Sequence, residues 1–215
     1  MPVRRFLRLW RERAASHFWA ACLVFIALFA FGASLAAAHP DSTKDITELI
    51  AQNFAAKGLL EAEAPMQAWI IFSNNLTVCF LLLVFGLIPF LFLPHFIIAM
   101  NGFAVGVVIV IAAASLPAGS RVLFAAAGLL PHGIFELPAL FIAASLGSFC
   151  CARLTGALLG KSKPAEGEGE EKNRWGPRQT ALFAAKTFLL FILPLLIIAA
   201  IAEIWLTPLA LKAIL

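Results

Sequence analysis

The sequence is poor in charged residues and has no tyrosine. Only 13% of its 215 residues are Asp, Glu, Lys or Arg, whereas 62% are hydrophobic. Soluble domains carry about a quarter charged and about 45–50% apolar residues, so this composition excludes a soluble globular fold. The net charge of +4 does not indicate nucleic-acid binding, because the basic residues stand at the ends of apolar runs, where they orient spans. The composition predicts an integral membrane protein in contact with the lipid bilayer.

Motifs for metal binding and for nucleophilic catalysis are also missing. The four cysteines have no CxxC spacing and no pair of histidines beside them; they are Cys22, Cys79, Cys150 and Cys151. A zinc site therefore has no support. No serine or cysteine stands in a recognisable nucleophile motif. We accordingly predict no catalytic residue, no metal and no cofactor.

The first apolar run covers residues 18–38. At about 1.5 Å per helical residue it is long enough to cross a hydrocarbon core of about 30 Å. Five arginines in the preceding segment, 1–17, place that basic arm in the cytoplasm. The "SLAAA" before "HPDS" also resembles a signal-peptidase site. We favour a retained anchor, because the run is longer than the usual apolar region of about 7–15 residues in a signal peptide.

Residues 39–68 are predicted to form an extracytoplasmic loop, because acidic residues outnumber lysines there. Apolar residues recur at helical spacing in this loop, at Ile46, Leu49, Ile50 and Phe54. We expect an amphipathic helix on the outer membrane surface, or packed on the spans. Ser42 and Asp45 have the spacing of a capping box at its start, and Gly58 is expected near its end. A helix that binds a partner protein is the alternative.

Residues 69–152 are expected to hold three spans and a half-helix. Residues 68–118 contain no charged residue and are too long for one crossing, so the chain must fold back. The prolines of "LIPFLFLPHF" predict that turn, with spans near 69–91 and 96–116. The next apolar run, 122–152, is also too long for one untilted span. We therefore expect Pro131 to break it into an interfacial or re-entrant half-helix and a span.

Residues 153–181 are rich in Gly, Glu, Lys and Pro and are predicted to form a disordered cytoplasmic linker. Residues 182–215 then hold the last span and an extracytoplasmic C-terminus. Tryptophans fall at three predicted span ends, as in an aromatic belt: Trp19, Trp69 and Trp205. The predicted fold is all-α, a polytopic transmembrane bundle of five spans with an outer amphipathic helix and a Pro-broken fourth span.

Few polar residues remain inside the predicted spans. The main ones are Asn74, Asn75, Asn101, His132, Glu136 and Glu203. A charged side chain at the centre of a bilayer costs about 2.5–3.5 kcal/mol on insertion scales, so such residues face protein or water and are candidates for function. Glu203 is the weakest candidate, because it lies near a span end and can reach the lipid headgroups.

His132 and Glu136 are four residues apart, on one helical face. Gly133 between them permits a close backbone approach, and Pro138 frees a carbonyl that an asparagine could satisfy. Three interpretations compete for this polar cluster. The residues could hydrogen-bond to the asparagines and fix how the spans pack, line a path for a small solute or ion, or catalyse a reaction as a His–Glu pair.

The polar blocks resemble the stage II sporulation protein M family. "FSNNLTVCFLLLVFGLIP" is similar to the family's Asn-Asn block, "AMNGFAVG" to its Asn-Gly block, and "LLPHGIFELPALFIAASLG" to its Pro-His-Gly-x-x-Glu block. The matching positions form the candidate site: Asn74, Asn75, Asn101, Gly102, Pro131, His132, Gly133 and Glu136.

The resemblance implies a multi-pass protein of the bacterial plasma membrane. The namesake works beside a peptidoglycan-degrading enzyme and a third membrane protein. We therefore expect a non-catalytic component of a cell-envelope complex, with other envelope membrane proteins as partners, one of them a peptidoglycan-active enzyme. The alternatives are a transporter or channel for a small solute or ion, and an intramembrane enzyme. The sequence leaves a homo-oligomer open.

Overall fold

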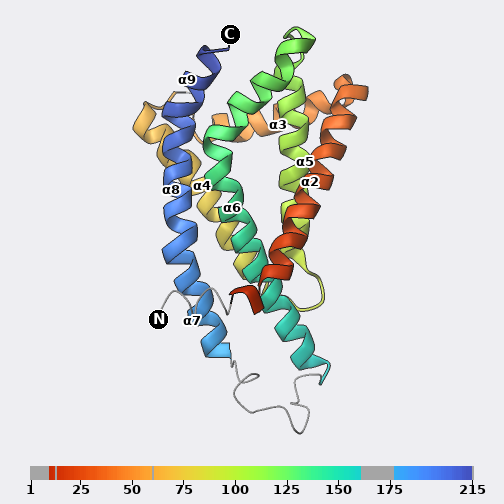
Figure 1. Cartoon of the computed structure of the whole chain (residues 1–215), viewed down its shortest axis with the longest axis vertical. Coiled ribbons are helices and arrows are strands. Elements are labelled where there is room, and N and C mark those ends of the chain that lie inside the picture. Colours follow the sequence, from red (N-terminus) through yellow and green to blue (C-terminus); the bar gives the residue numbers. More distant parts are fainter. Residues whose placement is uncertain (1–9, 13, 60, 161–176, 215) are drawn as a thin grey trace.

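The computed structural model of the chain describes residues 10–12, 14–59, 61–160 and 177–214 (Figure 1). All regular elements in these ranges are helical, and five helices are long and apolar enough to cross a membrane. The predicted all-α, five-span bundle is therefore confirmed. One end of the bundle carries α3 and the last turns of the chain, and we call it the α3 end (Figure 1). The opposite end carries the turn 86–92, and we call it the linker end.

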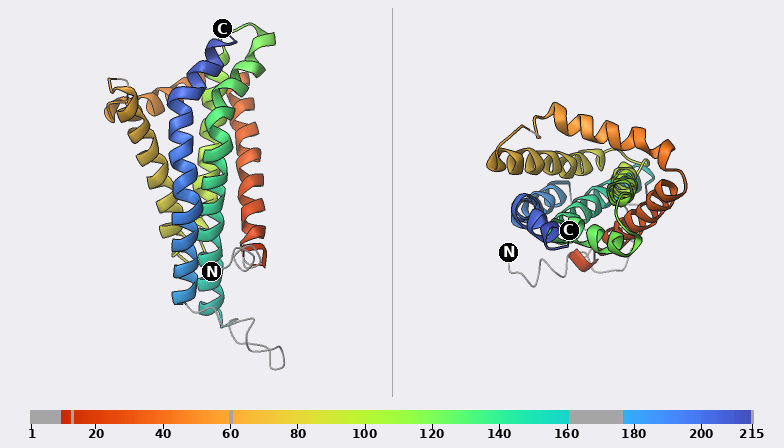
Figure 2. Two further views of the ribbon diagram at one scale, coloured as in Figure 1. Left: turned by 60° about the vertical axis from the view of Figure 1, so that its left-hand side comes forward. Right: turned by 90° about the horizontal axis from the view of Figure 1, so that it is seen from above.

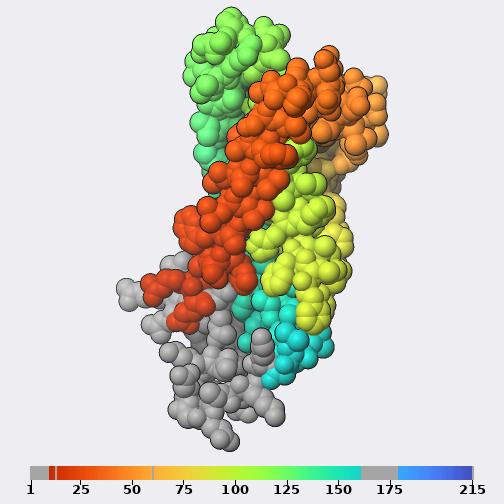
Figure 3. All heavy atoms as spheres, turned by 90° about the vertical axis from the view of Figure 1, so that its right-hand side faces the viewer, coloured from red at the N-terminus to blue at the C-terminus, as the bar shows by residue number. Residues whose placement is uncertain are grey.

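Helix α2, Ala15–Ala38, and helix α5, Leu93–Ala113, lie side by side and make the most extensive helix–helix contact (Figure 3). Glycines permit it, because Gly102 and Gly106 of α5 lie against the backbone carbonyls of Phe25 and Phe29. Their spacing is the small-xxx-small pattern of membrane helices, which lets two backbones approach closely. Gly102 is therefore a packing residue between α2 and α5.

Helix α4, Ala64–Phe85, returns the chain to the linker end, where a turn over 86–92 leads into α5. This turn binds one face of α6: the Phe90 N–H donates to Thr155 Oγ1 at 2.9 Å, and Cys151 Sγ donates to the Ile88 carbonyl at 3.3 Å. Phe90 and Phe92 have φ of 70° and 44°, which is unusual for bulky side chains. The predicted fold-back is thus present, and contacts with α6 hold its strained backbone.

Helix α6 runs without a break from Ala118 to Leu158, with Pro131 and Pro138 inside it. The predicted division into a half-helix and a span is wrong, and α6 bends instead (Figure 1). A proline removes one hydrogen bond of its own helix, whereas a complete break of a helix inside a membrane exposes several backbone groups to lipid. A bent but continuous helix therefore costs less. The helix also continues through residues 153–158, which were predicted to belong to the linker. Residues 177–181, at the other end of the predicted linker, begin α7 instead. Residues 161–176, between these helical ends, lie outside the described residues.

The last span is a rod of successive helical segments (Figure 2). They are α7 (Pro177–Thr187), η1 (Phe188–Ile192), α8 (Leu193–Ile201), η2 (Ala202–Leu206) and α9 (Thr207–Lys212). Both η segments are π-helical, and each ends two residues before a proline. The N–H groups of Leu193 and Thr207 donate to the carbonyls five residues earlier. The wider turn keeps the rod continuous where a proline would otherwise interrupt it.

Helix α3, Pro40–Ala56, crosses the α3 end of the bundle and packs on α2 and α5 (Figure 2). It begins at Pro40, so the predicted capping box at Ser42 and Asp45 is wrong. Proline suits the first helical position because its φ is already helical and its missing N–H would have no partner there. Gly58, with a φ of 73°, follows the helix as predicted.

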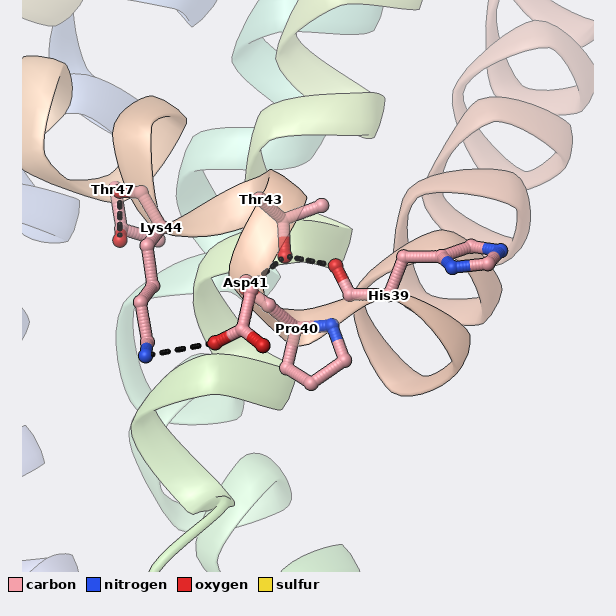
Figure 4. Close-up of polar contacts among 6 residues, drawn as sticks. All are labelled: His39, Pro40, Asp41, Thr43, Lys44 and Thr47. Atoms are coloured by element: carbon pink, nitrogen blue, oxygen red, sulfur yellow. Dashed lines mark hydrogen bonds and ion pairs between the residues drawn. The ribbon is translucent and has the colours of Figure 1, made fainter.

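Local contacts stabilise the first turn of α3 (Figure 4). The buried Thr43 hydroxyl lies 3.2 Å from the His39 carbonyl and 3.0 Å from the Pro40 carbonyl, and donates to them. Lys44 Nζ donates to Asp41 Oδ1 at 2.9 Å. This hydrogen bond lowers the pKa of the exposed Asp41 carboxyl and raises the pKa of Lys44. Asp41 is thus already paired, close to the point where α3 meets α2.

Candidate functional site

A chain of polar side chains runs from the α3 end into the middle of the bundle. Lys57, just after α3, donates to Asn74 Oδ1, and Asn74 Nδ2 lies 3.5 Å from Asn75 Oδ1. The Asn75 side chain in turn hydrogen-bonds the Glu136 carboxyl on α6. A charged group at the surface is therefore connected to a partly buried carboxyl through two amides.

A second set of contacts joins the same face of α6 to the last span. His132 lies one turn before Glu136, and its Nδ1 pairs with Glu203 Oε2 of η2. The Thr207 hydroxyl lies 3.3 Å from His132 Nδ1 and 3.5 Å from Glu203 Oε2. We call the whole set the polar chain: Lys57, Asn74, Asn75, Glu136, His132, Glu203 and Thr207.

Three spans supply every member of the polar chain except Lys57, which follows α3. Helix α4 supplies both asparagines, α6 supplies His132 and Glu136 at helical i, i+4 spacing, and the last span supplies Glu203 and Thr207. Glu203 lies inside the π-helical η2, which contacts both α4 and α6. A π-turn holds more residues per turn than an α-helix and so rotates the side chains that precede it about the helix axis. The proline at 208 thus influences where Glu203 points.

Glu203 was judged the weakest candidate from the sequence because it could reach the lipid headgroups, whereas the structure pairs it with His132. The side chains of His132 and Glu203 are 16% and 32% exposed, so the pair is largely withdrawn from the surroundings. A signal was present in the sequence, because Glu136 and Glu203 are the two carboxylates in the predicted spans and His132 is a possible cation between them. Charged groups in hydrocarbon need partners, so such residues should be paired first with one another.

Two predicted residues lie away from the polar chain. Asn101 donates from Nδ2 to the Ile97 carbonyl of its own helix at 2.9 Å, and Gly102 packs against α2. Gly133 has only side chains of its own helix, Leu129 and Leu137, near the position of a Cβ, so the predicted close backbone approach is not present there. The helix break predicted at Pro131 is absent, and the functional roles proposed for the remaining candidates stay predictions.

His95 is another histidine of the described bundle, and it lies away from His132 and Glu136. It lies in the first turn of α5 at the linker end, where its Nδ1 is 3.0 Å from Ser148 Oγ of α6. Among the described residues, no group of three or more His, Cys, Asp or Glu side chains is arranged to hold a metal ion.

The contacts of His132 do not form a hydrolase triad. In a triad the imidazole receives a hydroxyl proton on one nitrogen and is held by a carboxylate on the other. Here Thr207 and Glu203 both contact Nδ1, so the ring cannot relay a proton between them. Thr207 also lies 3.4 Å from the Ala202 carbonyl, which accepts from its hydroxyl. Within the described ranges, no buried side-chain nitrogen or oxygen lacks a hydrogen-bond partner. The arrangement can therefore hold helices together or hold a proton.

Comparison with known protein families gives a match over most of the chain. The family model described as Stage II sporulation protein M matches residues 21–208. The matched region includes every member of the polar chain, from Lys57 to Thr207. No curated protein and no solved structure matches the chain.

Proposed function

Because this chain belongs to the stage II sporulation protein M family and is a multi-pass membrane protein, we propose that it is a non-catalytic component that organises a cell-envelope complex. The polar chain is the main support. Spans in lipid gain little from apolar contact with one another, so polar pairs and close packing determine their relative positions. The polar chain links α4, α6, the last span and the residue after α3, which favours a fixed shape over a reacting centre.

The exposed face of α3 is the surface that fits a protein partner. It carries acidic side chains beside an apolar one, since Asp45 and Glu48 are exposed and Leu49 is 61% exposed. The helix itself is held on α2 and α5, so it presents this face in a defined orientation. We propose that the partner is another envelope membrane protein, such as one that acts on peptidoglycan.

The proposal requires a particular orientation in the bacterial plasma membrane. Arginines before α2 and basic residues around the linker favour the cytoplasm for the linker end, and the acidic α3 segment favours the outer side. We expect a membrane-impermeant thiol reagent, added to whole cells, to label Ser42→Cys but not Ser162→Cys. The unsubstituted chain is the control, because it shows how much of the labelling comes from the four native cysteines. If Ser162→Cys is labelled and Ser42→Cys is not, the orientation is the reverse of the one proposed. Helix α3 would then lie on the cytoplasmic side, where it could not meet an envelope partner.

The partner proposal is tested by crosslinking in native membranes, followed by purification in mild detergent. We expect an envelope protein to be recovered in constant proportion to the chain, and Leu49→Glu to remove most of it. Ser42→Glu, on an exposed position of the same helix, is the control for added charge. Recovery of the intact chain without any constant partner would contradict the proposal, as would equal recovery with Leu49→Glu.

A transporter of protons or cations is the second candidate, and the His132–Glu203 pair is the observation that favours it. π-Helical segments are frequent at functional sites, and ionisable residues inside membrane spans often mark ion pathways. Proton flux into vesicles that contain the purified chain, lost in Glu203→Gln, would favour this function over the scaffold.

A further inference from the structure

An apolar groove of about 480 Å³ lies near the α3 end, between α2, α5 and the first turns of α6. Small side chains leave this volume open, because many of the lining residues are alanines. Its walls include Phe29, Ala33, Ile109, Ala113, Val122 and Ala125. Val122 is 78% exposed, so the groove opens to the outside of the bundle, where the bilayer surrounds a membrane-spanning chain. Its volume is in the range of about 300–1,000 Å³ for ligand pockets.

Arg121 is the charged side chain among the residues that line the groove. Its Nε donates to the Leu116 carbonyl at 3.0 Å and its Nη2 donates to the Ala114 carbonyl at 3.1 Å. These two bonds hold the guanidinium at the end of the groove, and they use two of its five N–H donors. A guanidinium fixed in this way presents its other donors in a planar fork that suits phosphate.

No carboxylate from the neighbouring sequence neutralises Arg121. It is the one charged residue between Glu63 and Glu136. Pro40 also lines the groove, but the adjacent Asp41 is paired with Lys44 at 2.9 Å (Figure 4). Helix α6 starts three residues before Arg121 without a side-chain cap, so its dipole adds to the positive potential there. An anion with a long apolar tail would satisfy both parts of this site.

We propose that the groove binds an anionic phospholipid, with one acyl chain between α2, α5 and α6 and the phosphate on Arg121. The bilayer supplies this ligand at high local concentration. The lipid would fill the space that the alanines leave and would tie α6 to α2 at the end where α3 begins. This site is separate from the polar chain and does not depend on the scaffold function.

The test is native mass spectrometry of the full chain in detergent, with phosphatidylglycerol and phosphatidylcholine of identical acyl chains. We expect one phosphatidylglycerol to bind with preference, and Arg121→Gln to weaken it about tenfold, which corresponds to about 1.4 kcal/mol, because the variant loses a charge-assisted hydrogen bond to phosphate. Arg121→Lys should retain part of the preference. Glycerol phosphate without acyl chains should not compete, because it cannot fill the groove.

Ala125→Phe tests the acyl-chain part of the site and keeps Arg121 in place. We expect it to reduce binding of phosphatidylglycerol at least as much as Arg121→Gln. Matched controls are Leu123→Phe, on an exposed position of the same helix, and Lys212→Gln, which removes an exposed cation of α9 at the same end. Equal binding of the two lipids overturns the proposal. A preference for phosphatidylglycerol that survives both Arg121→Gln and Ala125→Phe also overturns the proposal. The same holds if both controls reduce the preference as much as these two variants do.

Discussion

Replacing Gly106 with leucine is expected to destabilise the bundle by about 3 kcal/mol or more, at the upper end for overpacking. Gly106 lies against the carbonyl of Phe29 and the amide nitrogen of Ala33, both backbone atoms of α2. A flexible side chain could move away from an added Cβ, but the backbone of a long helix cannot move without separating from α5. Unfolding titrations in detergent, followed by circular dichroism and near-ultraviolet absorption, measure the change.

Gly156 offers a matched control in another membrane helix. It lies in the last turns of α6, and nothing is within 4 Å of the position of its Cβ. Gly156→Leu should therefore be close to neutral, or stabilising by up to about 1 kcal/mol through higher helix propensity. If Gly106→Leu unfolds at the same denaturant concentration as Gly156→Leu, the close contact between α2 and α5 is not what holds these helices together.

Hydropathy, the length of a span and the prolines of one turn were sufficient to predict the five spans. A chain in lipid must satisfy its backbone groups within each segment, so a long apolar run becomes a helix whatever its neighbours are. The same rule explains why the break at Pro131 was predicted wrongly. Proline propensities come mainly from water, where a freed carbonyl can bond to solvent, whereas in the bundle α6 retains its remaining hydrogen bonds and bends.

The partners within the polar chain were harder to predict than its members. His132 and Glu136 are four residues apart, so their shared face follows from helical geometry. The pairing of His132 with Glu203 depends instead on how α6 packs against the last span and on the π-turn before residue 208. Asn101 shows the opposite error, because an amide inside a helix can bond to its own backbone, as it does with Ile97. Helical spacing shows which side chains share a face of one helix. It does not show whether a polar side chain bonds to another helix or to its own backbone.

Replacing Glu136 with leucine is expected to cost about 1–3 kcal/mol of stability, whereas Glu136→Gln should cost much less. The leucine leaves the Asn75 amide without its partner on α6, and an unsatisfied buried donor costs about 1–3 kcal/mol. The glutamine keeps an oxygen that can accept from Asn75. Thermal or denaturant unfolding of the purified chain in detergent measures both variants under one set of conditions.

Asn101→Leu is the matched control for losing a polar group inside a span. Asn101 bonds to a carbonyl of its own helix, which remains in the helical ladder after the substitution, so no buried donor is orphaned. The expected cost is below the mean of about 0.6 kcal/mol measured for polar contacts between membrane helices, because no contact between helices is lost. Equal costs for Asn101→Leu and Glu136→Leu would mean that the contact between α4 and α6 contributes no more than an average polar contact.

A double-mutant cycle with Asn75→Ala assigns the cost of Glu136→Leu to that contact. If the amide and the carboxyl act together, the two substitutions together should cost less than the sum of the single ones, by about 0.5–2 kcal/mol. Glu136→Gln then separates the two functions, because it removes a titratable group and keeps a hydrogen-bond acceptor. A scaffold should keep its stability and its partner in this variant, since its spans remain in place. A proton carrier should keep its stability but lose its flux, since the amide cannot take up and release a proton at this position.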